Sequence, residues 1–394
     1  MQFRNIEKIK KSINQELENR INNHKKNYYL ELKSHDSEFF KYENYIKGKY
    51  ILNIDNKEKI LFNHIEDKSI KGHINNDLNI ISYVKLEFNS FKRCKFKDII
   101  FKNCIFNGNI FSKCIFENVL FENCSFYKLD NINIFSDECI LTKSIFKNCN
   151  LESNVFKECK IINLKFIDSN LENVIFSNMF ISNNKISDCN FKGVKIINSD
   201  IEKFKFEDKN ITKLDEYVFI DTIIIDKKYK NSYDETSKVY KNISNKLNEN
   251  NLLNYASEYH YLSRCIENKS LTGIDKIKST ICWLICGYGE RPTYALITSL
   301  EIIFAFAVLY MFTGISVNGV DISYIEVFSY GFSQRNIITD FMNCLYFSTV
   351  TFTTVGYGDI TPLNTSVFFS GVEMFLGLTM MGIWTATLAR KITR

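Results

Sequence analysis

The chain of 394 residues is 45% hydrophobic, contains twelve cysteines and carries a formal net charge of +5. This length predicts two or three domains, and so small a net charge gives no indication of nucleic-acid binding. The charged start, Met1–Lys11, lacks the apolar segment of a secretory signal peptide. We therefore expect the cysteines to be reduced and cytosolic.

Residues 1–80 are expected to form a mostly helical cap region. Apolar residues recur every three or four positions between Phe3 and about Lys33, which is the spacing of an amphipathic helix. Further along, Tyr50–Ile54 and Lys59–His64 are predicted to pair as a β-hairpin.

A five-residue repeat runs from Ile81 to Ile211. Of the 27 positions in this register, 25 are apolar, whereas the overall composition predicts about 12; the exceptions are Asn131 and Ser136. A step of five residues keeps neither to one face of a helix nor to one face of a strand. The chain must therefore turn a corner in every repeat. Residues two before each centre are mostly small, and we expect the cysteines among them to be buried packing residues rather than metal ligands.

This register resembles that of the pentapeptide-repeat family, whose right-handed quadrilateral β-helix places four repeats in each turn. The resemblance implies between six and seven coils over residues 81–212. Because the two exceptions fall at Lys128–Ser144, we expect a bulged or looped coil there. Some members act as acidic mimics of DNA. Residues 81–211 carry 19 basic and 16 acidic side chains, a balance that argues against mimicry.

Residues 213–270 are predicted to form a helical-hairpin linker. Its two helices, Asp234–Leu247 and Leu252–Glu267, are separated by a polar turn. Residues 271–290 then begin with basic side chains and continue with apolar ones that include Trp283. This pattern is typical of a helix that lies in the membrane interface.

Residues 291–394 contain two apolar stretches, Thr293–Gly314 and Leu363–Ala389, each long enough to span a bilayer. Between them, Asp340–Thr353 is expected to form a short helix, N-capped near Thr339 or Asp340. The sequence T-V-G-Y-G follows at Thr354–Gly358. Its alternating glycines allow left-handed backbone conformations, so that successive carbonyls can face one axis and replace the water shell of K⁺.

Residues 291–394 therefore resemble the pore of a two-transmembrane tetrameric potassium channel. The resemblance implies a K⁺ selectivity filter formed by Thr354, Val355, Gly356, Tyr357 and Gly358. It also implies a homotetramer, since one chain supplies a quarter of each oxygen ring. We expect K⁺ as the permeant ion, no cofactor and no enzymatic activity.

The expected architecture is multidomain: a quadrilateral β-helix, a helical-hairpin linker and an all-α transmembrane pore domain with two spanning helices and a pore helix. Basic residues flank both apolar stretches, and the positive-inside rule places both termini in the cytoplasm. We therefore expect the protein to lie in the plasma membrane, with the lipid bilayer as its partner. The resemblance implies that this membrane is a bacterial one.

Further residues of the pore region have expected roles. Gly377 and Gly382 match the hinge glycine and the close-packing glycine of the family, although tight helix packing is an alternative role for either. Val350 stands where some members have a glutamate that pairs with the filter aspartate, so we expect Tyr346 to hold Asp359 instead.

Two carboxylates, Glu301 and Glu373, fall near the middle of the bilayer. Neither spanning segment offers a Lys or Arg as a partner. Each glutamate is either neutral and bonded to a pore-helix group, or the two share a proton and couple the pore to pH.

The sequence shows no arginine-rich voltage-sensing helix before the pore and no Rossmann-type ligand domain after it, so it indicates no gating stimulus. The repeat domain is expected either to assemble or to gate the pore, through an unidentified cytosolic protein or ligand. A non-conducting membrane anchor that displays a repeat scaffold is the alternative function.

Overall fold

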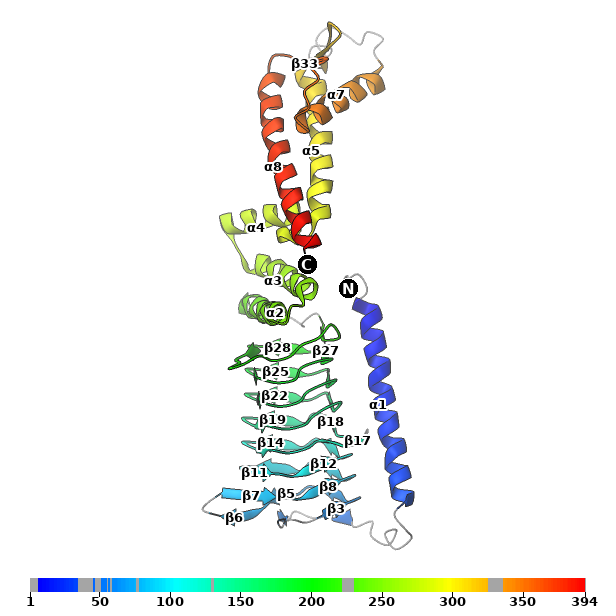
Figure 1. The fold of residues 1–394 in the computed structure, drawn as a ribbon, viewed down its shortest axis with the longest axis vertical. Helices are drawn as coiled ribbons and strands as arrows, with labels where there is room; N and C mark the ends of the chain where they lie inside the picture. Colours follow the sequence, from blue (N-terminus) through cyan, green and yellow to red (C-terminus); the bar gives the residue numbers. More distant parts are fainter. Residues whose placement is uncertain are drawn as a thin grey trace. The chain divides into compact units, whose positions relative to one another are not determined.

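The computed structural model describes residues 6–34, 45–46, 51–54, 56, 59–75, 78–128, 131–221, 230–324 and 336–393. It comprises two compact units, Met1–Ser270 and Leu271–Arg394. The first unit contains a β-solenoid of about eight turns, and the second is mainly helical (Figure 1). The predicted fold class is confirmed.

Short parallel strands stack along four faces of the solenoid. The first face carries β1 (Tyr45–Ile46), β4 (His64–Glu66), β9 (Ser90–Lys92), β13 (Ile110–Ser112), β18 (Ile134–Ser136), β21 (Val155–Lys157), β24 (Ile175–Ser177), β27 (Lys195–Ile197) and β30 (Phe219–Ile220). The second carries β2 (Ile51–Asn53), β5 (Ser69–Lys71), β10 (Lys95–Lys97), β14 (Ile115–Glu117), β19 (Ile140–Thr142), β22 (Lys160–Ile162), β25 (Phe180–Ser182) and β28 (Asp200–Glu202).

The remaining two faces complete each turn. The third carries β6 (His73–Asn75), β7 (Leu78–Ser82), β11 (Ile99–Lys102), β15 (Leu120–Glu122), β20 (Ile145–Lys147), β23 (Lys165–Ile167), β26 (Lys185–Ser187) and β29 (Lys205–Phe206). The fourth has β3 (Lys59–Leu61), β8 (Lys85–Glu87) and β12 (Ile105–Asn107), continued by single bridges through Ser125, Asn150, Asn170, Asn190 and Lys213.

Nearly every corner of the solenoid contains a residue in the left-handed backbone region, two positions after the buried centre. Asn118, Asn123 and Asn178 have φ of 54°, 54° and 55°. Asparagine tolerates this conformation better than most residues, which accounts for its abundance at this repeat position. The corner that the five-residue period required is thus made by one left-handed residue per repeat.

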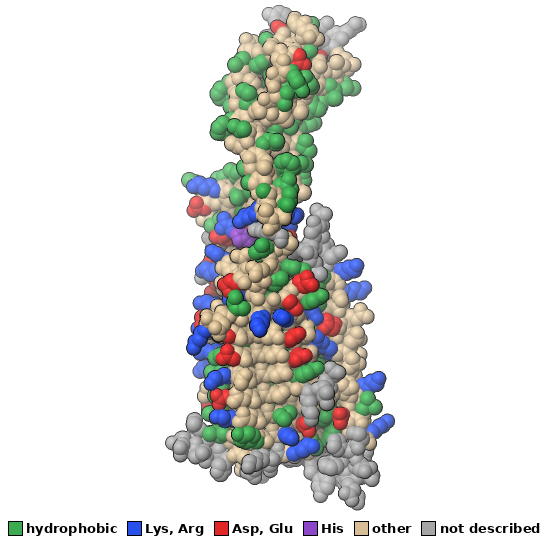
Figure 2. All heavy atoms as spheres, viewed as in Figure 1, with side chains coloured by type: hydrophobic (Ala, Val, Ile, Leu, Met, Phe, Trp, Pro, Cys, Tyr) green, Lys and Arg blue, Asp and Glu red, His purple; other side chains and the backbone are tan. Residues whose placement is uncertain are grey.

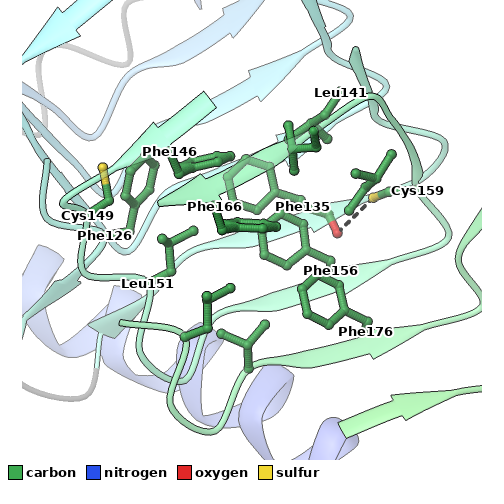
Figure 3. Packing of buried hydrophobic residues seen from close by; sticks show 14 of the residues in the cluster. Phe126, Phe135, Leu141, Phe146, Cys149, Leu151, Phe156, Cys159, Phe166 and Phe176 are labelled. Atoms are coloured by element: carbon green, nitrogen blue, oxygen red, sulfur yellow. Dashed lines mark hydrogen bonds between the residues drawn. The ribbon is translucent and has the colours of Figure 1, made fainter. Parts of the chain in front are cut away.

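Phenylalanines at the repeat centres stack in columns inside the solenoid. Phe135, Phe156 and Phe176 lie one above another, with ring centroids 4.5 and 5.1 Å apart (Figure 3). This separation is close to the spacing of neighbouring strands, so the rings follow the backbone stack. The columns exclude water from the solenoid interior, and the stabilising contacts therefore run along its whole length.

The eight cysteines of the repeat region are buried and free. Seven of the thiols donate to carbonyls of the preceding coil, as Cys159 Sγ does to Phe135 O at 3.3 Å (Figure 3), whereas Cys189 Sγ donates to Ser187 O at 3.2 Å. At another corner the same position holds asparagines that hydrogen-bond between coils: Asn109 Oδ1 accepts from Asn89 N at 2.9 Å, and Asn133 Oδ1 from Asn109 N at 3.0 Å. These buried polar groups are satisfied between coils.

The solenoid begins earlier than expected, so the prediction of a mostly helical region up to residue 80 is wrong beyond Ser34. One turn takes twenty residues between Phe91 and Phe111 but twenty-six between Ile65 and Phe91. The additional residues form the antiparallel pair β6 and β7. Because six additional residues are one more than a whole repeat, the repeat centres before β6 are displaced by one position. Counting back in steps of five from Ile81 therefore misses the centres of the earlier coils.

The β-hairpin predicted for Tyr50–Ile54 and Lys59–His64 is also absent from the described residues of these segments. β2 pairs with β5 and β3 pairs with β8, both in parallel. A looped coil is present near residue 128, where β16 (Tyr127–Lys128) and β17 (Asn131–Ile132) pair antiparallel. Phe135, one residue before Ser136, fills the core there.

Helix α1 (Ile6–Ser34) lies along the first face of the solenoid (Figure 1). Its Ile13 and Leu17 are buried against outward-facing apolar residues of several coils, among them Val155 and Ile175. The expected amphipathic stripe thus packs on the sheet.

Two antiparallel helices, α2 (Lys230–Glu249) and α3 (Leu253–Ser270), follow the last coil as the predicted helical hairpin. Leu247 and Tyr259 from this pair join the solenoid core. The hairpin therefore covers core residues that the final coil would otherwise expose.

The Leu271–Arg394 unit contains α4 (Gly273–Cys286), the short helix η3 (Gly287–Gly289), α5 (Pro292–Thr313), α7 (Ile337–Phe352) and α8 (Ser366–Ile392). A small antiparallel sheet joins β31 (Ile315–Val317), β32 (Val320–Ile322) and β33 (Ile360–Pro362). By length and composition, α5 and α8 are able to cross a membrane. On the visible face, this part of the chain carries hydrophobic side chains and few charged ones, whereas charges of both signs spread over the Met1–Ser270 unit (Figure 2).

Candidate functional site

The Thr354–Gly358 loop begins just after α7, which packs against both α5 and α8. The ring of Tyr310 on α5 lies edge-on to Phe347 of α7, with centroids 4.8 Å apart. α7 begins earlier than predicted, because Asn336 and not Thr339 or Asp340 is its N-cap; the Asn336 side chain accepts from Ile338 N at 3.2 Å. Asp340 instead accepts a hydrogen bond from Tyr324 Oη at 2.9 Å.

The backbone of the loop alternates in handedness. Thr354, Gly356 and Gly358 have φ of 58°, 59° and 80°. Left-handed φ at every second residue is the conformation that the sequence analysis required for aligned carbonyls. Thr354 adopts it despite its branched Cβ, which is costly for an ordinary residue and typical of functional sites.

Hydrogen bonds to the end of α7 fix the start of the loop. Val355 N donates to Val350 O and Thr354 N to Thr351 O, both at 3.0 Å. In the single chain Val355 and Tyr357 remain 53% and 72% exposed. The loop therefore presents most of its length to its surroundings rather than to its own unit.

The far end of the loop is held by Asp359. Tyr346 Oη donates to Asp359 Oδ2 at 2.8 Å, which is the contact expected from the sequence. Ile360 then enters β33 and pairs with Val317 of β31. The loop is thus anchored on one side to α7 and on the other to the small sheet.

Glu373 connects the three helices behind the loop. Its side chain is fully buried on α8, and its Oε2 accepts from Tyr310 Oη of α5 at 2.7 Å. Its Oε1 is hydrogen-bonded to Ser348 Oγ of α7, which also lies 2.8 Å from Ile303 O. This places Glu373 with a pore-helix group, the first of the two expected arrangements.

Proton counting indicates the state of this cluster. The Ser348 hydroxyl has one proton, which it can donate to Ile303 O or to Glu373 but not to both. If Glu373 is protonated, it donates to Ser348, and all three contacts are satisfied. In the described part of the chain no Lys or Arg forms an ion pair with Glu373, so a neutral carboxyl fits its surroundings best.

Glu301 is not brought to Glu373 within this chain. It is exposed on α5, and the hydrogen bonds of Glu373 go to Tyr310 and Ser348.

The two glycines of α8 differ in their surroundings. A Cβ at Gly377 would lie 1.9 Å from Phe352 O, at the end of α7, whereas a Cβ at Gly382 would meet nothing within 4 Å in this chain. α8 is one continuous helix through both. For Gly377 this geometry favours the packing role over the hinge.

Sequence reasoning missed Ser348, Tyr310 and Asn336. Ser348 and Tyr310 were visible as polar side chains within apolar helices, which in a membrane segment indicate a hydrogen-bonded partner. Asn336 was visible as an N-cap residue type before an apolar stretch.

Comparison with protein families matches both parts of the chain. Residues 322–394 match the model described as an ion channel. Residues 91–129 and 137–215 match pentapeptide-repeat models. The predicted fusion of a pentapeptide-repeat region with a region of the two-transmembrane channel type is confirmed. The ion-channel match and the two apolar helices α5 and α8 together suggest a membrane protein. Both matched families are non-enzymatic in general.

Several solved structures are similar to this chain over less than half of its length, among them two pentapeptide-repeat proteins. HetL, involved in heterocyst differentiation regulation in the cyanobacterium Nostoc sp. strain PCC 7120, is 6% identical with a TM-score of 0.28 and covers 45% of this chain and 89% of its own. QnrB1, a plasmid-mediated fluoroquinolone resistance protein, is 14% identical with a TM-score of 0.19. The match covers 40% of this chain and 91% of QnrB1. Rfr23 from the cyanobacterium Cyanothece 51142 is 11% identical with a TM-score of 0.16. The match covers 43% of this chain and 91% of Rfr23. No curated protein matched the chain.

We predict that Gly377→Ala destabilises the protein by about 1–3 kcal/mol or more, because the added methyl overlaps the Phe352 carbonyl and forces α7 and α8 apart. Thermal unfolding of the detergent-solubilised protein measures the effect. Gly371→Ala, on the same helix with nothing within 4 Å of the added atom, is the control and should be neutral or slightly stabilising. Equal losses for the two variants would contradict the packing role.

For Glu373 we predict that the Gln variant retains most of the stability, whereas Glu373→Leu loses about 1–3 kcal/mol, because the buried Tyr310 hydroxyl then has no acceptor. The amide of glutamine can donate to Ser348 and accept from Tyr310, as a neutral carboxyl does. Thermal unfolding at neutral pH compares the two. A Gln variant as unstable as the Leu variant would show that the native carboxylate is ionised.

Proposed function

We propose that the chain forms a K⁺-selective homotetrameric channel, with Thr354–Gly358 as the selectivity filter. The observation that carries the proposal is the left-handed φ at Thr354, Gly356 and Gly358 in a T-V-G-Y-G sequence. Rings of backbone carbonyls from four such loops would replace the hydration shell of K⁺. Asp359 and Tyr346 would hold the loop, and Glu373 would tie its supporting helices together.

The exposed surfaces of the single chain support a tetramer. The loop itself is exposed, and so are large apolar residues on α8, including Phe368, Phe375 and Leu378. Exposed apolar side chains on a spanning helix meet either lipid or another helix. Four copies around one axis would bring the loops together and leave the outer residues for lipid.

Charge and exposure also suggest the orientation in the membrane. Lys276 and Lys278 on α4 and Arg390 and Lys391 at the end of α8 flank the apolar helices. The positive-inside rule then places both termini in the cytoplasm, with the protein in the plasma membrane. The α4 side chains Ile274, Ile277 and Ile281 are exposed, which suits a helix at the inner membrane interface.

We predict a strong preference for K⁺ over Na⁺ when the purified protein is reconstituted in bilayers. Reversal potentials under bi-ionic conditions measure this preference, because a filter of dehydrating carbonyls discriminates between the two ions. Equal permeability to Na⁺ and K⁺ would overturn the selectivity. Absence of any current from correctly inserted tetramers would favour the alternative, a non-conducting anchor for the repeat scaffold.

The repeat domain is proposed to assemble or gate this pore. The chain passes from α3, which ends at Ser270, to α4, which begins at Gly273, so movement of the hairpin has a short covalent path to the membrane unit. We predict that deletion of residues 1–270, at the boundary between the two compact units, alters either assembly or open probability.

Cross-linking and single-channel recording of this deletion distinguish the two roles. Loss of tetramers indicates assembly, and a changed open probability in intact tetramers indicates gating. Intact tetramers with unchanged open probability would contradict both.

A further inference from the structure

A cavity of about 230 Å³ lies within the Met1–Ser270 unit, where three elements distant in sequence meet. α1 contributes Ile13 and Glu16, strands β27 and β30 contribute Lys195 and Phe219, and α3 contributes Tyr259. An engineered apolar cavity of about 150 Å³ holds benzene, so this one has room for about nine or ten non-hydrogen atoms. The cavity is separate from the predicted filter and from the aromatic columns of the solenoid.

The inner wall of the cavity is apolar. Ile13 and Phe219 are only 4% and 7% exposed. The Tyr259 hydroxyl accepts from Ile220 N at 2.9 Å and donates to Ile220 O at 3.1 Å. Because its hydroxyl is occupied by the backbone, Tyr259 offers the cavity its ring. This wall suits the hydrophobic body of a ligand.

A partly buried charge cluster forms one edge of the cavity. Lys195 Nζ lies 2.8 Å from Glu16 Oε2, and Arg20 Nη2 lies 2.6 Å from Glu16 Oε1. Arg20 also donates to the carbonyls of Ser153 and Asn173, which fixes its position on the solenoid. Two cations thus share one carboxylate, and the cluster has an excess of positive charge.

The ionisation state of Glu16 is consistent with two cations sharing one carboxylate. Burial alone would raise its pKa, but the hydrogen bonds and charges of Lys195 and Arg20 outweigh burial and leave the pKa below its ordinary value. Glu16 is therefore ionised at neutral pH. The ammonium of Lys195 has three donors, so at least one remains for a further acceptor besides the two oxygens of Glu16.

Other charges near the cavity do not cancel this excess. Glu216 lines its rim but is exposed, so solvent screens it. Asp221 is paired with Lys10 at 2.9 Å.

We propose that this cavity binds a small hydrophobic monocarboxylate, with its apolar body against Phe219 and Tyr259 and its carboxylate on Lys195. An anionic acceptor supplies the charge that the cluster lacks, and a charge-assisted hydrogen bond in a partly buried site is stronger than a neutral one. The site is independent of ion conduction, so its test does not require a functional pore.

Phenylacetate, with ten non-hydrogen atoms, is a suitable probe, and phenylacetamide is its neutral counterpart of the same size. Isothermal titration of the detergent-solubilised full chain should show saturable binding of phenylacetate and binding of phenylacetamide that is roughly tenfold weaker or more, since the charge-assisted hydrogen bond is lost. Absence of saturable phenylacetate binding up to its solubility limit, or equal binding of the two compounds, would overturn the proposal.

Variants of the cavity test the assigned roles. Lys195→Met should remove the preference for the carboxylate, and Lys195→Arg should restore it. Lys165→Met, at an exposed lysine of β23 outside the cavity, is the matched control and should bind as the unaltered protein does. Unchanged preference in Lys195→Met would contradict the assigned contact.

A second variant guards against the case in which Lys195→Met loosens α1. Ser12 lies on the exposed side of the cavity lining, and Ser12→Phe should fill the space and abolish binding of both compounds while Lys195 and Glu16 remain. Full binding by this variant would place the ligand elsewhere.

Discussion

Both parts of this protein depend on left-handed backbone conformations at regular intervals. In the solenoid one such residue stands at nearly every fifth position and turns the chain through a corner. In the Thr354–Gly358 loop it stands at every second position and keeps the backbone from alternating as a strand does. The same torsional constraint thus produces a coil with a corner in every repeat at one interval, and a loop of alternating backbone handedness at the other.

Asparagine is the commonest residue at these positions in the solenoid, and glycine is the commonest in the loop. The difference has a physical basis. At a solenoid corner the side chain points outward and an asparagine can hydrogen-bond to its counterpart on the next coil, as Asn183 does to Asn163. In the loop, a side chain at Gly356 or Gly358 would add strain, because φ is 59° and 80° at these positions. Thr354 is the exception, and its hydroxyl donates to Thr353 O.

Much of this architecture could be predicted from the sequence, because its signals are local and periodic. The repeat centres, the helical hairpin, the apolar helices and the T-V-G-Y-G segment each depend on residues close together in the chain. The Tyr346–Asp359 contact was also predictable, since the two residues lie thirteen positions apart in a predicted helix and loop.

Long-range features could not be predicted from the sequence. The coils before Ile81 were missed because a six-residue insertion shifts the register. The partners of Glu373 come from two other helices, whose packing the sequence does not specify. The cavity beside Lys195 joins residues 13, 195, 219 and 259, which no local pattern connects.

Because α1 contacts several coils, the length of this helix and the height of the solenoid cannot vary independently. Duplication of one twenty-residue coil is a simple genetic event that lengthens the solenoid by about 4.8 Å without disturbing the hairpin at its end. A helix gains the same length with about three residues. Because Glu16 and Arg20 contact different coils of the first face, a new coil inserted between those contacts would separate them unless α1 lengthened as well. The helix therefore restricts the coil numbers that evolution can reach, and homologous solenoids of different height should carry N-terminal helices that differ by whole multiples of about three residues.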